Sequence, residues 1–274
     1  MAEATNGTCR IHYETFGDPG NPTLLLVNGL GSQCINYHED WCAMFAAEGL
    51  HVVRFDNRDI GLSSVMEHDP GYTVADMAAD GMAVLDALGV ERAHVMGLSM
   101  GGMIAQHMAF LHPHRVITLT SVMSSTGEPE YRRSSPRAAQ LLVEPGAHDR
   151  EGYVRQWSEG LREWGSPAFA DEARWRREAE RAFDRGFRPE GVARQYQAIL
   201  RSGSWAHRLG EVDAPTLVIH GDKDTLIDQI GGRRTAELIP GARFELIEGM
   251  GHDYPPGLWR QWTDLVVAHV RSAA

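Results

Sequence analysis

The segment that decides the fold reads Ala93-His94-Val95-Met96-Gly97-Leu98-Ser99-Met100-Gly101-Gly102. It joins an apolar run to a helix-forming stretch, with a serine between two glycines, which is the context of a nucleophile elbow. In such a turn the serine is strained, and glycines two residues to either side avoid a collision with neighbouring chain. We therefore predict that Ser99 is lifted out of a sheet at a helix N-terminus, where amide groups favour developing negative charge. The alternative is a glycine-rich packing turn with an incidental serine.

Short apolar runs alternate with helix-period segments on both sides of this turn. Strands that are apolar throughout are typical of parallel sheets, because helices cover both faces. A capping box at Thr73 and Asp76 marks one helix start. The pattern predicts a doubly wound, mostly parallel α/β sheet. The expected strands are residues 23–27, 51–55, 93–96, 116–122, 216–220 and 243–247, and the expected helices are 74–88, 100–111 and 258–270.

The alternation stops between about Gly127 and Gly210, where Arg, Glu, Ala, Gln and Trp dominate. We expect this stretch to be helical and to lie over the carboxyl edge of the sheet. The predicted domains are thus a core made of residues 1–126 and 211–274 and a helical cap of residues 127–210. Four tryptophans of the cap either face a pocket or hold the cap to the core: Trp157, Trp164, Trp175 and Trp205.

A serine hydroxyl is a weak nucleophile at neutral pH, so it needs a base, and the base needs an acid that fixes its tautomer. The chain order for this elbow is Ser, then Asp or Glu, then His. Asp222 and Asp224 follow one predicted strand, and His252 follows the next in a glycine-flanked loop. We predict that Ser99 is the nucleophile, His252 the base and Asp224 the acid, while Asp222 braces the turn. Glu128, after the preceding strand, is a third candidate for the acid.

A glycine-rich turn, Asn28-Gly29-Leu30-Gly31, ends the first predicted strand. Such a turn supplies one backbone N–H of an oxyanion hole, and the residue after the nucleophile supplies the other. We therefore predict the amides of Leu30 and Met100 as the donors. A dinucleotide fingerprint is disfavoured because Cys34 stands where Gly or Ala is required, and no Gly-Lys-Ser/Thr is present for a P-loop. No cofactor is predicted.

Composition narrows the function classes further. Twenty-six Lys and Arg against 37 Asp and Glu give a net charge of -11, which disfavours nucleic acid and anionic membranes as partners. The three cysteines lack metal-ligand spacing, and no stretch reaches the roughly 18 apolar residues of a membrane span. We predict a cytoplasmic protein with a small-molecule ester substrate and no metal; its oligomeric state stays open.

The sequence resembles the α/β-hydrolase superfamily along nearly its whole length. Residues 53–64, VRFDNRDIGLSS, look like the D-x-R-x-x-G-x-S segment of that superfamily. Within it, the chain is most similar to the anthracycline methylesterases of the aclacinomycin type, in this block, in residues 92–101, in residues 249–252 and in the ending 268–274. The resemblance implies an α/β-hydrolase fold with a helical cap, and Ser, Asp and His that cleave a carbomethoxy ester on a polyketide ring. By analogy it assigns these roles to Ser99, Asp224 and His252.

The predicted function is hydrolysis of a carboxylic ester through an acyl-enzyme, with a methyl ester of an aromatic polyketide as the leading substrate. One alternative uses the same three residues for carbon–carbon bond hydrolysis or perhydrolysis. The other is a non-catalytic binder of a small molecule, in which the three residues are vestigial.

Overall fold

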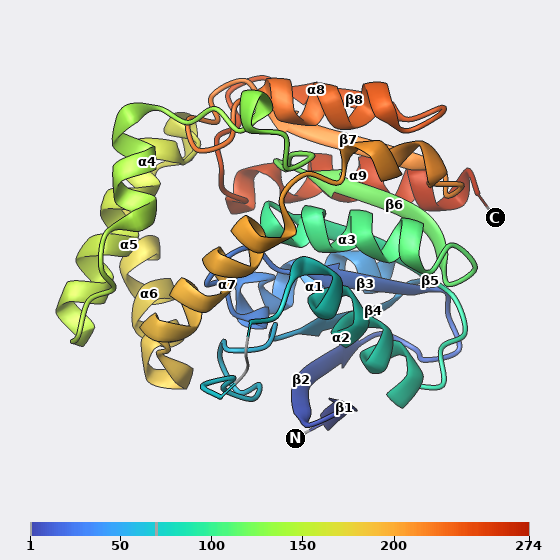
Figure 1. Cartoon of the computed structure of the whole chain (residues 1–274), viewed down its shortest axis with the longest axis horizontal. Helices are drawn as coiled ribbons and strands as arrows, with labels where there is room; N and C mark the ends of the chain where they lie inside the picture. Colours follow the sequence, from blue (N-terminus) through green and yellow to red (C-terminus); the bar gives the residue numbers. More distant parts are fainter. Residues whose placement is uncertain (1, 69–70, 274) are drawn as a thin grey trace.

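The apolar runs of the sequence form the centre of one eight-stranded sheet in the computed structural model, which describes residues 2–68 and 71–273 (Figure 1). Met1 and Ala274, the ends of the predicted core, lie outside this description. The strand order is β1-β2-β4-β3-β5-β6-β7-β8. The strands are β1 Ala2–Asn6, β2 Cys9–Phe16, β3 Thr23–Val27, β4 His51–Phe55, β5 Ala93–Leu98, β6 Val116–Val122, β7 Thr216–Gly221 and β8 Arg243–Ile247.

Strands β3 to β8 pair in parallel, and β1 and β2 form an antiparallel hairpin whose second strand pairs with β4. The predicted mostly parallel sheet is therefore confirmed, and all six predicted strands are present. The hairpin was not predicted. β1 lies at the edge of the sheet with a mixed polar sequence, and the buried residues of the hairpin are Ala4, Cys9, Ile11 and His12.

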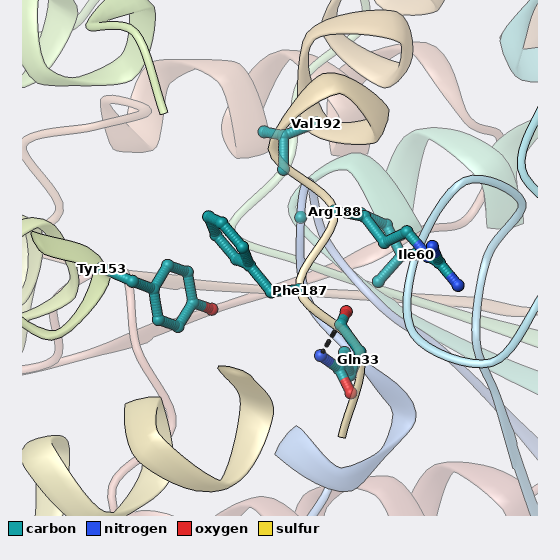
Figure 2. A pocket seen from close by; sticks show the side chains of 8 residues that line it. Gln33, Ile60, Tyr153, Phe187, Arg188 and Val192 are labelled. Atoms are coloured by element: carbon teal, nitrogen blue, oxygen red, sulfur yellow. Dashed lines mark hydrogen bonds between the residues drawn. The ribbon is translucent and has the colours of Figure 1, made fainter. Parts of the chain in front are cut away.

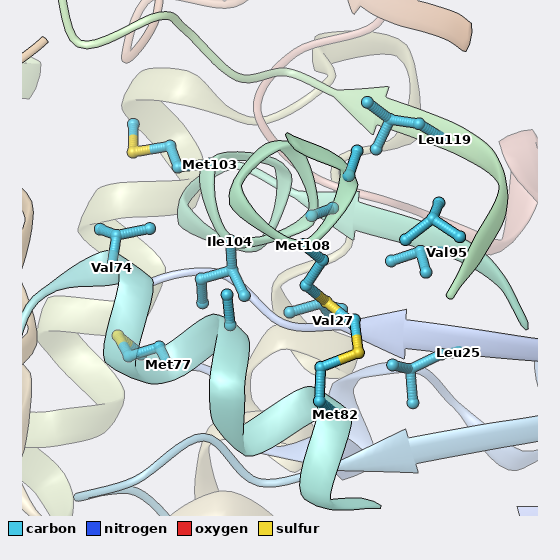
Figure 3. Packing of buried hydrophobic residues seen from close by; sticks show 14 of the residues in the cluster. Leu25, Val27, Val74, Met77, Met82, Val95, Met103, Ile104, Met108 and Leu119 are labelled. Carbon is cyan, nitrogen blue, oxygen red and sulfur yellow. The ribbon is translucent and has the colours of Figure 1, made fainter. Parts of the chain in front are cut away.

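Helices cover both faces of the sheet because the side chains of each central strand alternate between two apolar cores. Leu25 and Val27 of β3 point to the helices α2 and α3, and Leu24 and Leu26 point to α1 and α9. Figure 3 shows the first of these cores, where methionines of α2 and α3 pack on Leu25 and Val27. The helices outside the β6–β7 connection are α1 Glu39–Ala47, α2 Val74–Ala87, α3 Met100–Leu111, α8 Gln229–Leu238 and α9 Pro256–Arg271.

The predicted start of α2 is confirmed by its hydrogen bonds. The side chain of Thr73 accepts from the amide of Asp76, and the carboxylate of Asp76 accepts from the amide of Thr73 at 2.7 Å. This capping box satisfies donors that the first turn of a helix leaves without partners. No described helix is both long enough and apolar enough to cross a membrane.

The described chain between β6 and β7 contains helices and no strand, and we call residues 127–210 the helical segment. Helices α4, α5 and α6 stand together at one end of the molecule (Figure 1). Trp205 fixes the end of the segment to the core, because its Nε1 donates to Gln106 of α3 at 2.6 Å and its ring packs on His107. The long helices are α4 Pro136–Val143, α5 Arg150–Trp164, α6 Glu172–Gly186 and α7 Pro189–Ser202; short 3₁₀ turns are η1 Cys34–Asn36, η2 Pro129–Tyr131, η3 Pro167–Phe169 and η4 Ala206–Glu211.

The order of the strands indicates where a ligand would bind. From β3 the chain continues to β4 on one side, whereas β5 lies on the other side, so the order reverses between β3 and β5. In open α/β sheets, ligands bind at the carboxyl ends of the strands at such a switch point. The turn after β3 and Ser99 after β5 flank this position.

The close packing of the elbow leads to a stability prediction. A Cβ on Gly101 would overlap the carbonyl oxygens of Val27 and Asn28, whereas a Cβ on the exposed Gly210 has nothing within 4 Å. We expect Gly101→Ala to lower the free energy of unfolding by about 1–3 kcal/mol, as overpacked sites do. Gly210→Ala is the matched control and should change it by less than about 0.5 kcal/mol or raise it slightly. Urea unfolding measures both; equal effects would contradict the prediction.

Candidate active site

Ser99 sits in the strained turn that its flanking glycines predict. Its φ and ψ are 55° and -119°, and it immediately precedes α3. A Cβ on Gly97 would overlap the carbonyl of Gly101, so the turn requires glycine there. The turn after β3 lies against the serine, because a Cβ on Gly29 would be 3.3 Å from the Cβ of Ser99. The side chain of Ser99 is thereby held at the carboxyl end of β5, beside the N-terminus of a helix.

His252 and Asp224 come together across 28 residues of sequence. Nδ1 of His252 lies 2.6 Å from Oδ2 of Asp224, and the other carboxylate oxygen accepts from the amides of Leu226 and Ile227 at 2.9 and 2.8 Å. Nε2 of His252 is buried and has no hydrogen-bond partner among the described residues, so it is not hydrogen-bonded to Ser99. The structure thus brings the predicted acid and base together through Nδ1 of His252. Nε2 of His252 has no hydrogen-bond partner among the described residues.

The carboxylate of Asp224 is fully buried and nevertheless favours its charged form. Burial alone would raise its pKa, but the charge of His252 and the hydrogen bonds from His220 and His252 lower the pKa from 3.8 to about 2. Because Asp224 stays ionised at neutral pH, it can hold the proton of His252 on Nδ1 and support a positive imidazolium.

The other two candidate acids bond elsewhere. Asp222 was predicted to brace its own turn; it pairs with Lys223 at 3.0 Å and also accepts from the amide of Gly249 at 2.6 Å, which links the loops after β7 and β8. Glu128 forms an ion pair with Arg234 of α8 at 3.1 Å.

The sequence predicts His220 only as the last residue of the strand 216–220, and the structure places it beside Asp224. Its Nε2 lies 2.8 Å from the carbonyl oxygen of Ile227 and 3.3 Å from Oδ2 of Asp224. The signal in the sequence is only its position four residues before Asp224 in His220-Gly221-Asp222-Lys223-Asp224.

The helical segment holds the turn that contains Leu30. The amide of Gly31 donates to Oε1 of Gln195 at 3.0 Å, and Nε2 of Gln195 donates to the carbonyl of Arg58 at 2.8 Å. Gln195 is a fully buried residue of α7. Met100, the other predicted donor, is the first residue of α3, and an amide in the first turn has no acceptor within its helix.

The end of α5 holds the loop that carries His252. The amide of His252 donates to the carbonyl of Trp164 at 2.5 Å, and the amide of Gly251 donates to Oγ of Ser166 at 2.8 Å. Ser166 in turn donates through Oγ to the carboxylate of Asp253 at 2.5 Å, and its amide donates to the same oxygen at 2.8 Å. Ser166 and Asp253 are both buried. Through these contacts, the helical segment holds the loop that carries His252 in place.

A cavity lies between the helical segment and the turn after β3 (Figure 2). Its volume is about 20 Å³, and neighbouring rings of Tyr153 and Phe187 form one wall. Ser99 and His252 are not among its lining residues. The four tryptophans of the helical segment do not line it; Trp175 and Trp205 are buried in packing instead. The side chains labelled in Figure 2 are Gln33, Ile60, Tyr153, Phe187, Arg188 and Val192.

One group among the described residues has the composition of a metal site. His12, Cys34 and Asp56 place ligand atoms within 4.8 Å of one another. The guanidinium of Arg185 already lies there, 2.7 Å from the carboxylate of Asp56 and 3.2 Å from the sulfur of Cys34. Burial also raises the pKa of the Cys34 thiol, whereas metals bind the thiolate. The donor set therefore does not fit a metal ion.

The chain also matches a known protein family. A family described as the alpha/beta hydrolase fold matches residues 22–254. The chain belongs to the α/β-hydrolase family. The fold and the resemblance inferred from the sequence are thereby confirmed.

Individual relatives of this α/β hydrolase include carboxylic ester hydrolases. The chain is 31% identical to rhodomycin D methylesterase from Streptomyces peucetius, over 98% of this chain and 97% of the relative. It is 29% identical to 2-hydroxy-6-oxononadienedioate/2-hydroxy-6-oxononatrienedioate hydrolase from Burkholderia vietnamiensis, over 92% and 86% of the two chains. Among solved structures, an enol-lactonase from Burkholderia xenovorans shares the fold with a TM-score of 0.79 and 24% identity, covering 98% of this chain and all of that one.

The lowered pKa of Asp224 predicts how stability depends on pH. A carboxyl whose pKa is 3.8 unfolded and about 2 folded stabilises the protein above about pH 4 and loses this contribution as the pH falls through 2. The contribution is about 2 kcal/mol. We expect Asp224→Asn, which resembles the protonated acid, to be less stable than the parent by this amount near pH 6. In urea unfolding the difference should shrink as the pH approaches 2; a constant difference would be contrary to the prediction.

The contacts of Ser166 predict a local effect on the loop of the base. Ser166→Ala leaves the buried amide of Gly251 without an acceptor, so we expect a loss of about 1–3 kcal/mol in the free energy of unfolding. The amide of Gly251 should also exchange its hydrogen faster. Ser204→Ala removes a hydroxyl that accepts from an exposed backbone amide at 3.3 Å and serves as control. An equal loss of unfolding free energy in both variants would contradict the prediction that Ser166 stabilises the loop that carries His252.

Proposed function

We propose that this α/β hydrolase cleaves a carboxylic ester with Ser99 as nucleophile, His252 as base and Asp224 as the acid that orients the base. The observation that carries the proposal is the hydrogen-bonded pair of His252 and Asp224. Nε2 of His252 has no partner among the described residues, and the loop of His252 and the strained Ser99 both follow the carboxyl ends of strands in one sheet. A serine on such a turn, with a paired imidazole on another loop at the carboxyl edge of the sheet, is the arrangement used for acyl transfer.

The reaction proceeds in two halves. Nε2 of His252 takes the proton of the Ser99 hydroxyl while the oxygen attacks the ester carbonyl, and the amides of Leu30 and Met100 stabilise the oxyanion. His252 then protonates the leaving alcohol, which leaves an acyl group on Ser99. Water that gives a proton to His252 attacks the acyl-enzyme, and His252 returns that proton to the oxygen of Ser99 as the acid is released.

The proposed substrate is a methyl ester on an aromatic polyketide. The relative named rhodomycin D methylesterase supports this choice, since the similarity spans both chains almost completely. Tyr153 and Phe187 offer aromatic side chains on which planar rings pack, but the small cavity that they wall does not include Ser99 or His252, so the choice rests on this relative. In this proposal the helical segment is a cap that shapes the substrate site.

A second reaction, carbon–carbon bond hydrolysis by the same residues, is favoured by one specific comparison. The relative from Burkholderia vietnamiensis is named for a dienedioate substrate whose name contains no ester. A panel of methyl, short-acyl and long-acyl esters, aromatic polyketide methyl esters and dienedioates separates the two reactions, because the leaving group is an alcohol in one and a carbon fragment in the other.

Substitution of Ser99 tests the proposed chemistry. We expect Ser99→Ala to lower kcat for p-nitrophenyl acetate by a factor of about 10⁴ or more, because the nucleophile is lost. Asp224→Asn should lower kcat about 10³- to 10⁴-fold through the wrong tautomer of His252. Asp222→Asn is the matched control from the same loop and should retain most of the activity.

A fluorophosphonate probe supplies the complementary measurement. Mass spectrometry should find the probe on Ser99 of the parent protein. Parent-like hydrolysis by Ser99→Ala would defeat the proposal, and a parent protein that binds aromatic esters but neither turns them over nor reacts with the probe would indicate a binder.

A further inference from the structure

The imidazole of His220 is a buried titratable group that the reaction above does not use. It lies at the end of β7, and its side chain has no exposed surface. Both atoms that face Nε2 are acceptors, namely the carbonyl oxygen of Ile227 at 2.8 Å and Oδ2 of Asp224 at 3.3 Å. Nε2 must therefore carry a proton and donate it.

Nδ1 of His220 is buried without a hydrogen-bond partner among the described residues. Gly232 of α8 is packed against it so closely that a Cβ at position 232 would overlap Nδ1. Burying an unpaired polar atom costs stability, and an apolar side chain in this place would avoid the cost. The contacts of Nε2 therefore explain why a histidine stands at position 220, whereas packing in the core alone does not.

Nε2 of His220 and the backbone of Ile227 both contact Asp224, and they also contact each other. Ile227 donates its amide to Oδ1 of Asp224 and accepts from His220 with its carbonyl, so one residue links the two groups. As a result, Oδ1 faces two amides, and Oδ2 faces the two imidazoles of His220 and His252. Rotation of the carboxylate would disturb all four contacts together.

We propose that His220 is a positioning residue, which holds the carboxylate of Asp224 so that Oδ2 meets Nδ1 of His252. This inference rests on the proposed function, because it concerns the same acid and base. His220 itself touches neither the ester nor Ser99 and acts only through Asp224.

Two polar substitutions test whether the Nε2–H is what matters. In His220→Gln the amide nitrogen takes the place of Nε2, whereas in His220→Asn the shorter side chain places its nitrogen near Nδ1. We expect His220→Asn to lower kcat for p-nitrophenyl acetate about 10-fold or more with an unchanged KM, because the carbonyl of Ile227 and Oδ2 of Asp224 lose the donor that lies between them. His220→Gln should remain within about threefold of the parent, because it keeps the donor.

The matched control is His94→Asn in β5. His94 is also a buried strand histidine, but it bonds to Thr118 at 2.9 Å, at the opposite end of its strand from Ser99. This variant should leave kcat unchanged. The proton on Nδ1 of His252 adds a spectroscopic readout: its downfield NMR resonance should shift or broaden in His220→Asn and persist in His220→Gln and His94→Asn.

Three results would overturn the positioning role: parent-like kcat and resonance in His220→Asn, equal losses in the Gln and Asn variants, or an equal loss in His94→Asn. Failure of the proposed function looks different, because Ser99→Ala would then retain hydrolysis whatever the variants of His220 do. An inactive Ser99→Ala together with a fully active His220→Asn would remove the positioning role alone.

Discussion

The whole site depends on the absence of side chains at Gly97 and Gly101. A Cβ at either position would collide with backbone carbonyls, of the elbow itself in one case and of the turn after β3 in the other. Without those atoms, β5, α3 and the turn after β3 approach closely enough for Ser99 to stand at the switch point of the sheet. The positive φ of Ser99 costs roughly 1–3 kcal/mol, and such strain persists only where the surroundings over-determine the backbone. Here they do, because Ser99 donates its amide to Val122 of β6 at 2.9 Å.

The buried charge of Asp224 is the second constraint, and it depends on loops that the parallel sheet brings together. The loops after β7 and β8 lie side by side because these strands are neighbours at the edge of the sheet. A buried carboxylate is stable only when hydrogen bonds and an opposite charge replace water. Two amides and the N–H groups of two imidazoles surround the carboxylate of Asp224, so its lowered pKa follows from the packing of the loops.

Much of the fold and part of the site could be predicted from the sequence, for physical reasons that differ between residues. The central strands were recognisable because both of their faces are buried, and Ser99 because its turn requires glycines. Asp224 was preferred over Asp222 from its place in the loop alone, and the hydrogen bond to His252 agrees with that choice. His220, Gln195 and Ser166 could not be found, because each acts through a partner far away in sequence or through a loop that folds back. Nothing local distinguishes such a residue from an ordinary polar one.

The contacts of Ser166 and Gln195 with the core limit how the helical segment can move. The cavity has a volume of about 20 Å³, far below the roughly 300–1,000 Å³ typical of ligand pockets, so the proposed polycyclic ester would require the helical segment to move. A rigid swing of the whole segment would withdraw the carbonyl of Trp164 from His252, Ser166 from Gly251 and Gln195 from Gly31. It would disturb the base and the turn after β3 at the moment when the substrate arrives. Movement that spares these contacts has to be local, and Phe187, between α6 and α7, lines the cavity without taking part in any of them.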